Sequence, residues 1–97
     1  MKWLWTWDGH CFGYRDHEDL WTCDGKHVGK IDGKDIYDSQ GKYLGEIINR
    51  DRLITCTSKK HDKGFKFKPY PNRPAVTKNV DYAAYKMFVG YEDFPKL

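Results

Sequence analysis

The chain has 97 residues, a formal net charge of +3 and 16% aromatic residues. This length fits one domain with a limited hydrophobic core, and a chain so rich in aromatic residues is not intrinsically disordered. So small a net charge does not by itself indicate a nucleic-acid-binding protein.

From its sequence, we expect the chain to have no targeting or membrane-spanning segment. Lys2 leads directly into an alternating aromatic run, with no apolar region of the signal-peptide kind. No apolar run approaches the roughly 20 residues that a transmembrane helix needs. The odd number of cysteines, three, argues against a secreted disulfide framework. We therefore expect a cytoplasmic protein with no membrane partner.

The N-terminal half repeats a unit of sixteen residues. Two columns of glycine recur at this spacing, Gly9, Gly25 and Gly41, and Gly13, Gly29 and Gly45. Apolar residues share three further columns, Leu4, Leu20 and Ile36, then Trp5, Trp21 and Tyr37, then Phe12, Val28 and Leu44. Because a fixed internal period sets the architecture, we assign repeats to residues 3–18, 19–34 and 35–50.

Each repeat is predicted to form a β-hairpin. The first glycine column follows Asp or Gln, and Asp-Gly between alternating residues is a strong hairpin signal because glycine accepts positive φ. The flanks are rich in the aromatic and β-branched residues that suit strands. The second glycine column lies within strand-like runs, where it marks a bulge, a bend or a close backbone approach.

A fourth repeat begins near Leu53 and loses the pattern after Cys56. Residues 88–93 match residues 11–16, which places Gly90 in the second glycine column. We therefore assign the fourth repeat to residues 51–56 plus 86–94, split by an insertion at residues 57–85. Four hairpins can close around a common axis, with the N-terminal strand meeting the C-terminal one, which removes exposed sheet edges. The predicted fold is an all-β domain with a pseudo-four-fold axis.

Four runs of residues carry a resemblance to a known family. They are WTWDGHCFGYRD (5–16), DGKHVG (24–29), IYDSQGKYLG (36–45) and VGYEDFP (89–95). In these runs the chain resembles the bacterial family called the four-fold β-flower domain, over nearly its whole length. The resemblance implies a small β-rich fold and transfers no catalytic or binding residue to this chain.

The insertion is basic, aromatic and rich in proline. Pro69, Pro71 and Pro74 favour extended backbone and forbid a helix there. Positive charges and aromatic rings interleave in the way that suits phosphate and base contacts, and the candidate ligand-binding residues are Lys59, Lys60, Lys66, Lys68, Arg73, Phe65, Phe67 and Tyr70. The alternative is a long loop whose aromatic rings fix it to the barrel while its lysines stay solvated.

Other residue types carry weaker signals. The spacing of Cys11, Cys23 and Cys56 does not fit a zinc site, and buried free thiols are the favoured interpretation, although four-fold symmetry leaves open an approach of Cys23 to Cys56. His10, His17 and His27 flank turns, where a solvated histidine is expected. Asp16, Glu18 and Asp19 are interpreted as turn-capping residues. The tryptophans are expected in the core, with an exposed aromatic rosette as the alternative.

The function predicted from sequence is a non-enzymatic binding or interaction module, because no catalytic motif is present. Its ligand would lie in the axial depression or against the basic insertion. The alternative is a protein that binds nucleic acid, a nucleotide or another anion through residues 58–78. We predict no cofactor, no metal and no catalytic residue. An exposed aromatic face would favour a homo-oligomer, but internal four-fold symmetry does not require one.

Overall fold

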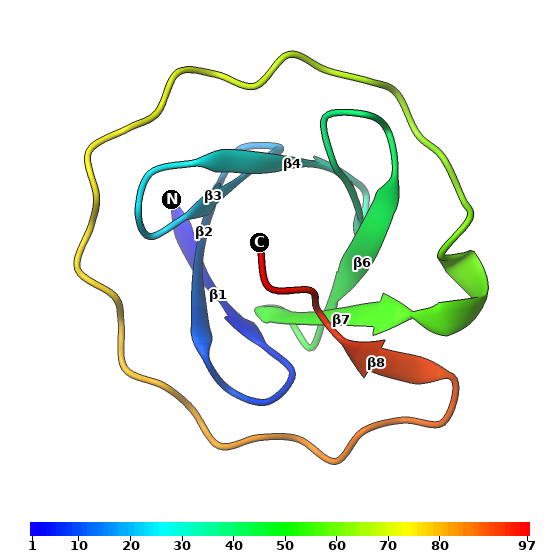
Figure 1. The fold of residues 1–97 in the computed structure, drawn as a ribbon. Coiled ribbons are helices and arrows are strands. Elements are labelled where there is room, and N and C mark those ends of the chain that lie inside the picture. Colours follow the sequence, from blue (N-terminus) through cyan, green and yellow to red (C-terminus); the bar gives the residue numbers. More distant parts are fainter.

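The computed structural model describes residues 1–97 and is almost entirely β-structure. One 3-10 turn, η1 (Thr57–Lys59), follows the seventh strand. The strands are β1 (Lys2–Thr6), β2 (Cys11–Asp16), β3 (Asp19–Thr22), β4 (His27–Asp32), β5 (Asp35–Tyr37), β6 (Tyr43–Ile48), β7 (Arg52–Cys56) and β8 (Tyr91–Asp93). They form a single sheet in chain order (Figure 1). The structure contains no helix with the length and apolar character that a membrane crossing requires.

The sheet closes through a parallel pairing of β1 with β7, in which Trp5 lies opposite Arg52. The closed barrel therefore has seven strands, and β8 pairs only with β7. The expectation that the N-terminal strand meets the C-terminal strand is wrong. Strand β8 pairs with residues Ile54 to Cys56 along one edge of β7. Strand β1 pairs with the remaining residues of that edge, Arg52 and Leu53.

The three N-terminal hairpins are built alike. Hairpin 1 is β1–β2, hairpin 2 is β3–β4 and hairpin 3 is β5–β6, and the register in each shifts by one residue at an equivalent point. The extra residues are Phe12, Val28 and Leu44. The glycine after each of them allows a close approach, since a Cβ on Gly13 would lie 2.0 Å from the Trp21 carbonyl oxygen. The second glycine column thus accompanies a bulge, as the sequence predicted.

The fourth unit follows the same register with different residues. Asp93 lies opposite Ile54 as Cys11 lies opposite Trp5, so Phe94 takes the place that Phe12 has in hairpin 1. The match of Gly90 with Gly13 is therefore out of register. Gly90 instead lies in the turn before β8, with a φ of 83°. Strand β8 ends at Asp93 because Pro95 follows closely, and a proline has no N–H to donate to the next ladder hydrogen bond.

The core lies on the axis that the units share. Each unit contributes a fully buried aliphatic residue at the same repeat position, and these residues are Leu4, Leu20, Ile36 and Leu53. Ile31, Leu44 and Phe94 complete the buried cluster. Each such side chain contributes about 1.5–3 kcal/mol by leaving water. The axis is therefore a packed core rather than a channel.

Residues 60–90 form a belt that encircles the barrel (Figure 1). The belt contains no named strand, and it donates backbone hydrogen bonds to the tip of each hairpin in turn. The pairs are Gly64 to Gly41, Phe67 to Ser39, Arg73 to Gly25, Val76 to Cys23, Tyr82 to Gly9 and Tyr85 to Trp7, at 2.7–3.0 Å. Donors therefore recur every nine residues along the belt, while the acceptors recur every sixteen along the hairpins.

Adding a methyl group at a hairpin tip should weaken the belt contact. Gly25 has a φ of 90°, and a Cβ there would lie 1.9 Å from the Arg73 carbonyl oxygen. Gly33 also has a positive φ, of 63°, but its Cβ would meet nothing. We expect Gly33→Ala to cost about 1 kcal/mol from backbone strain alone, and Gly25→Ala about 2–3 kcal/mol because the belt must also move.

Urea unfolding measures both costs, and limited trypsin digestion at Lys66, an exposed belt residue, reports on the belt. Faster cleavage is expected for Gly25→Ala and not for Gly33→Ala. Equal stability and equal cleavage of the two variants would contradict the contact.

Candidate functional site

Three of the five predicted cations are ion-paired with the barrel. The Lys59 Nζ lies 2.8 Å from Asp35 and 3.3 Å from the buried carboxylate of Glu46. The hydrogen bond to Asp35 is the main cause of a raised pKa of Lys59. Lys60 pairs with Glu92. These charges are held by acidic partners, so they are less available to an external ligand.

Arg73 is the third paired cation. Its guanidinium lies 3.0 Å from Asp16 and 3.8 Å from the centre of the Trp21 ring. Lys66 and Lys68, by contrast, are exposed and make no ion pair. The structure therefore separates the predicted cations into three that fasten η1 and the belt to the barrel and two that are solvated.

The predicted aromatic residues also separate. Phe65 is 92% exposed, whereas Phe67 and Tyr70 pack on the ring of His27, with centroids 4.9 and 5.0 Å away. The Tyr70 ring also lies parallel to Trp21 at 6.3 Å. Two of the three predicted aromatic residues thus fix the belt against hairpin 2.

His27 is the centre of this contact, and the expectation of a solvated side chain is wrong for it. Its side chain is 1% exposed, its Nδ1 accepts the Tyr70 backbone N–H at 3.0 Å, and its Nε2 lies 2.9 Å from Asp19. Burial lowers the pKa of His27 and outweighs the opposing effect of Asp19. The residue is therefore a neutral acceptor for the belt. His17, in contrast, has a 92% exposed side chain.

Three of the four tryptophans, Trp5, Trp7 and Trp21, are buried against the belt rather than displayed as a rosette, and Trp3 is partly buried. The Trp5 Nε1 donates to the Val80 carbonyl at 2.8 Å and its ring stacks on Tyr82 at 4.0 Å. The Trp7 Nε1 donates to the Lys86 carbonyl at 3.1 Å. The indoles of Trp5 and Trp7 thus each satisfy their one donor with a belt carbonyl, which explains why large aromatic residues occupy these two positions.

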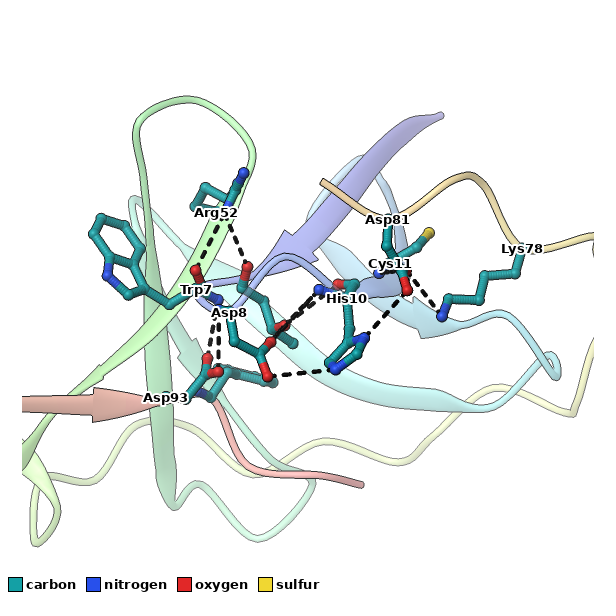
Figure 2. Close-up of polar contacts among 10 residues, drawn as sticks. Trp7, Asp8, His10, Cys11, Arg52, Lys78, Asp81 and Asp93 are labelled. Carbon is teal, nitrogen blue, oxygen red and sulfur yellow. Dashed lines mark hydrogen bonds and ion pairs between the residues drawn. The ribbon is translucent and has the colours of Figure 1, made fainter. Parts of the chain in front are cut away.

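Arg52 was not singled out by sequence reasoning, and it occupies the seam where β1 meets β7. Its guanidinium donates to the carbonyl of Trp7 at 3.2 Å (Figure 2) and to the carbonyl of Ala83 at 2.9 Å. The Tyr85 ring covers it at 4.0 Å. Arg52 is 3% exposed and its partners are backbone carbonyls, so it links the barrel seam to the belt. No sequence signal distinguishes it from exposed arginines.

Two clefts separate the hairpins at the end of the barrel where the C-terminal residues 93–97 lie. Cleft 1, of 460 Å³, lies between hairpin 1 and the tip of hairpin 2. Cleft 2, of 660 Å³, lies between hairpin 3 and the fourth unit. Asp93, Pro95 and Leu97 border both clefts. Both volumes lie in the range of about 300–1,000 Å³ typical of small-molecule sites.

A row of charged groups that the sequence did not predict begins on the wall of cleft 1, at Asp8 and His10, and continues to the belt (Figure 2). The His10 ring lies between two carboxylates, with Nε2 3.5 Å from Asp8 and Nδ1 3.2 Å from Asp81. Lys78 lies 3.0 Å from the Asp81 carboxylate. The backbone N–H of Cys11 donates to Asp81 and is the main cause of its lowered pKa. This row joins hairpin 1 to the belt.

Two carboxyl groups of cleft 1, those of Asp8 and Asp24, have a lowered pKa. Partial burial opposes ionisation of Asp8, but the Thr6 hydroxyl and the His10 backbone N–H outweigh it and lower the pKa. The Thr22 hydroxyl lowers the pKa of Asp24 in the same way. The carboxylate of Asp93 accepts the backbone N–H groups of Trp7 at 2.9 Å and Asp8 at 3.2 Å.

The floor of cleft 1 is apolar. Phe12 and Phe94 meet edge to face with centroids 5.2 Å apart. The Cys11 and Cys23 side chains line the same cleft. No group of three or more His, Cys, Asp or Glu side chains in residues 1–97 is arranged to hold a metal ion. The site therefore combines an acidic rim with an apolar floor.

The thiols do not follow the approach that symmetry suggested for Cys23 and Cys56. Cys56 makes its contact with Ser58, at 3.3 Å from Sγ to Oγ. Cys23 instead neighbours Cys11. Burial raises the pKa of Cys23 to about 11, and the nearby Cys11 thiol adds to this shift. At neutral pH the Cys23 thiol is protonated.

Comparison with known proteins agrees with this architecture. A family model described as 4-fold beta flower protein matches residues 1–87. The chain belongs to this family. The match confirms the resemblance predicted from the repeats, and with it the all-β class of this β-flower protein. Neither curated proteins nor solved structures gave a match.

Acid should weaken the β-flower through His27. Because its folded pKa lies below the ordinary value of about 6.5, the unfolded chain takes up the proton first as the pH falls. The stability that neutral His27 contributes is therefore present above that value and is lost below it. We expect the unfolding free energy to fall between about pH 7.5 and pH 5.5.

Urea unfolding of three proteins isolates this contribution. His27→Phe keeps the stacked ring and loses the acceptor for Tyr70, so it should be less stable at neutral pH and show a flatter pH dependence. His17→Asn, at an exposed position, should keep the wild-type slope. A wild-type slope in His27→Phe would show that other groups control the pH dependence.

Proposed function

We propose that this β-flower protein is a non-enzymatic binding module that holds a small organic cation with an apolar portion in cleft 1. The observation that carries the proposal is the acidic rim above an apolar floor in a concave site of 460 Å³. Sites for small molecules typically combine apolar walls with a few convergent polar groups. Cleft 1 has this combination.

Charge supports a cationic ligand. Asp8, Asp24 and Asp93 contribute carboxylates to the lining, whereas Lys96 is the one lysine there. Hydrogen bonds lower the pKa of Asp8 and Asp24, so both remain charged at neutral pH. A recessed group of like charges raises the local concentration of oppositely charged ligands. An ammonium group is the expected partner of this rim.

The floor supports an apolar portion on the same ligand. Phe12 and Phe94 offer ring edges and faces to a bound group, and aromatic contacts add to the energy of area burial. Binding without catalysis is supported by the side chains themselves. Both ring nitrogens of His10 are engaged by carboxylates, and the Cys23 thiol has a raised pKa of about 11. The His10 ring therefore links two carboxylates, and only a minor fraction of the Cys23 thiol is the nucleophilic thiolate at neutral pH.

Phenethylamine should bind more tightly than the uncharged phenylethanol, because only the amine pairs with the rim. NMR chemical-shift titration measures both affinities and places the ligand. Asp24→Asn should weaken phenethylamine binding several-fold and leave phenylethanol unchanged. Asp32→Asn removes the same charge from an exposed position outside the cleft lining and should have no effect. Equal binding of the two compounds, or shifts away from Phe12, would contradict the proposal.

A second candidate function is the binding of an anion on the belt. It is favoured by one observation, the exposure of Phe65 beside two lysines without ion-pair partners, Lys66 and Lys68. Lysines neutralise phosphates and an exposed ring stacks on bases in single-stranded nucleic acid. The paired residues Lys59, Lys60 and Arg73 would contribute less, since their carboxylate partners compete with the ligand.

Single-stranded RNA should bind this surface weakly at low salt and lose affinity as salt rises. The double variant Lys66→Ala/Lys68→Ala should reduce the slope of log affinity against log salt by about 1.4, since each single-strand phosphate contact contributes about 0.7. Lys2→Ala/Lys86→Ala removes the same charge from exposed lysines without ion pairs and should keep the slope. Fluorescence anisotropy measures both slopes. Equal slopes for the two double variants would eliminate this candidate.

A further inference from the structure

The geometry points to a reversible dithiol–disulfide site formed by Cys11 and Cys23 on the floor of cleft 1, with a small disulfide of the glutathione type as its oxidant. The inference is independent of any ligand in the cleft. It concerns a covalent modification of the chain's own side chains, which can be followed without a binding assay.

The two cysteines lie at neighbouring ends of β2 and β3. Cys11 begins β2 and Cys23 follows the end of β3, and the last pair of the β2–β3 ladder is Gly13 with Thr22. Beyond that pair, the antiparallel register places Cys23 opposite Phe12, the bulge residue that follows Cys11, so the two cysteines lie on adjacent strand ends. Both side chains line cleft 1. The Cys11 thiol is near enough to raise the pKa of Cys23, which agrees with this placement.

The belt also converges on this pair. The backbone N–H of Cys11 donates to Asp81 at 2.9 Å, and the carbonyl of Cys23 accepts the Val76 N–H at 2.8 Å. Lys78 lies between these two belt residues in sequence, and its charge interacts with both thiols. Its ammonium group favours a thiolate at Cys23, whereas Asp24 opposes it. His10 and Asp8 line the same cleft.

Access decides which thiol reacts first. Cys23 is partly exposed and Cys11 is buried, so the Cys23 thiolate attacks one sulfur of the small disulfide. One thiolate leaves and takes up the proton that Cys23 released. The Cys11 thiolate then attacks the Cys23 sulfur of the mixed disulfide, and the second small thiol leaves with the second proton. The protein loses two electrons and two protons, and the oxidant becomes two thiols.

The bridge would tie hairpin 1 to hairpin 2 across the floor of cleft 1. It would close a short loop that contains the first inter-hairpin turn, which restricts the unfolded chain and raises stability. The bridge would also stabilise the hydrogen bonds that Cys11 and Cys23 make with the belt at Asp81 and Val76. Cys56 takes no part, because it contacts Ser58 outside the cleft 1 lining.

The test uses the full chain with Cys56→Ser, equilibrated with glutathione and glutathione disulfide. Intact mass should fall by about 2 Da, peptide mapping should show Cys11 joined to Cys23, and dithiothreitol should reverse the change. The oxidised monomer should unfold several degrees higher than the reduced one. The further variants Cys11→Ala and Cys23→Ala should not form this bridge, and Cys23→Ala should react more slowly because only the buried thiol remains.

Circular dichroism establishes that each variant is folded before oxidation. The rate of oxidation should rise about tenfold per pH unit near neutrality, because the reacting thiolate is a minor species. Accumulation of a glutathione adduct on the Cys56→Ser protein would overturn the proposal. So would two unreacted thiols in the folded protein under conditions that oxidise the urea-unfolded chain, or a bridge between two chains.

Discussion

Backbone hydrogen bonds between the belt and the hairpin tips are the constraint on which the rest of the structure depends. Each tip turns outward and presents carbonyl oxygens that the sheet does not use, and the belt supplies an N–H for them at nine-residue intervals. Nine extended residues span about 30 Å, which carries the chain about a quarter of the way round a disc 36 by 32 Å across. The belt length is thus set by the size of the barrel.

This constraint explains most of the composition of the insertion. Pro69, Pro71 and Pro74 keep the belt extended, and none of them occupies a position that must donate to a tip. Tyr70 and Phe67 fill the space over His27, and Arg73 covers Trp21. Most basic and aromatic residues of the insertion therefore serve to hold the belt against the barrel. The exposed belt residues that make no such contact are Phe65, Lys66 and Lys68, and these are the residues that a ligand could contact.

The sequence predicted the hairpins because each turn leaves a local mark, an Asp-Gly or Gln-Gly followed four residues later by a second glycine. It could not predict the belt period, because a backbone N–H donates equally well from Gly64, Arg73 or Tyr82 and leaves no common side chain. It could not predict cleft 1 either. That site needs Asp93 and Phe94 beside Asp8 and Phe12, and their register depends on β8 pairing with β7. The buried state of His27 likewise depends on Tyr70, which lies far away in sequence.

The incomplete fourth unit is the source of the asymmetry that makes a site. In each of the first three units a full second strand follows the bulge, whereas the fourth stops at Pro95. The edge of β7 that β8 leaves free is closed by β1, and Arg52 fills the seam with a cation held by backbone carbonyls. The chain after Phe94, having no strand to continue, turns along the mouth of the barrel and borders both clefts. A complete fourth strand would instead continue along β7 to Leu53 and Arg52, which now pair with β1. The break in the repeat therefore leaves a concave surface at the mouth of the barrel.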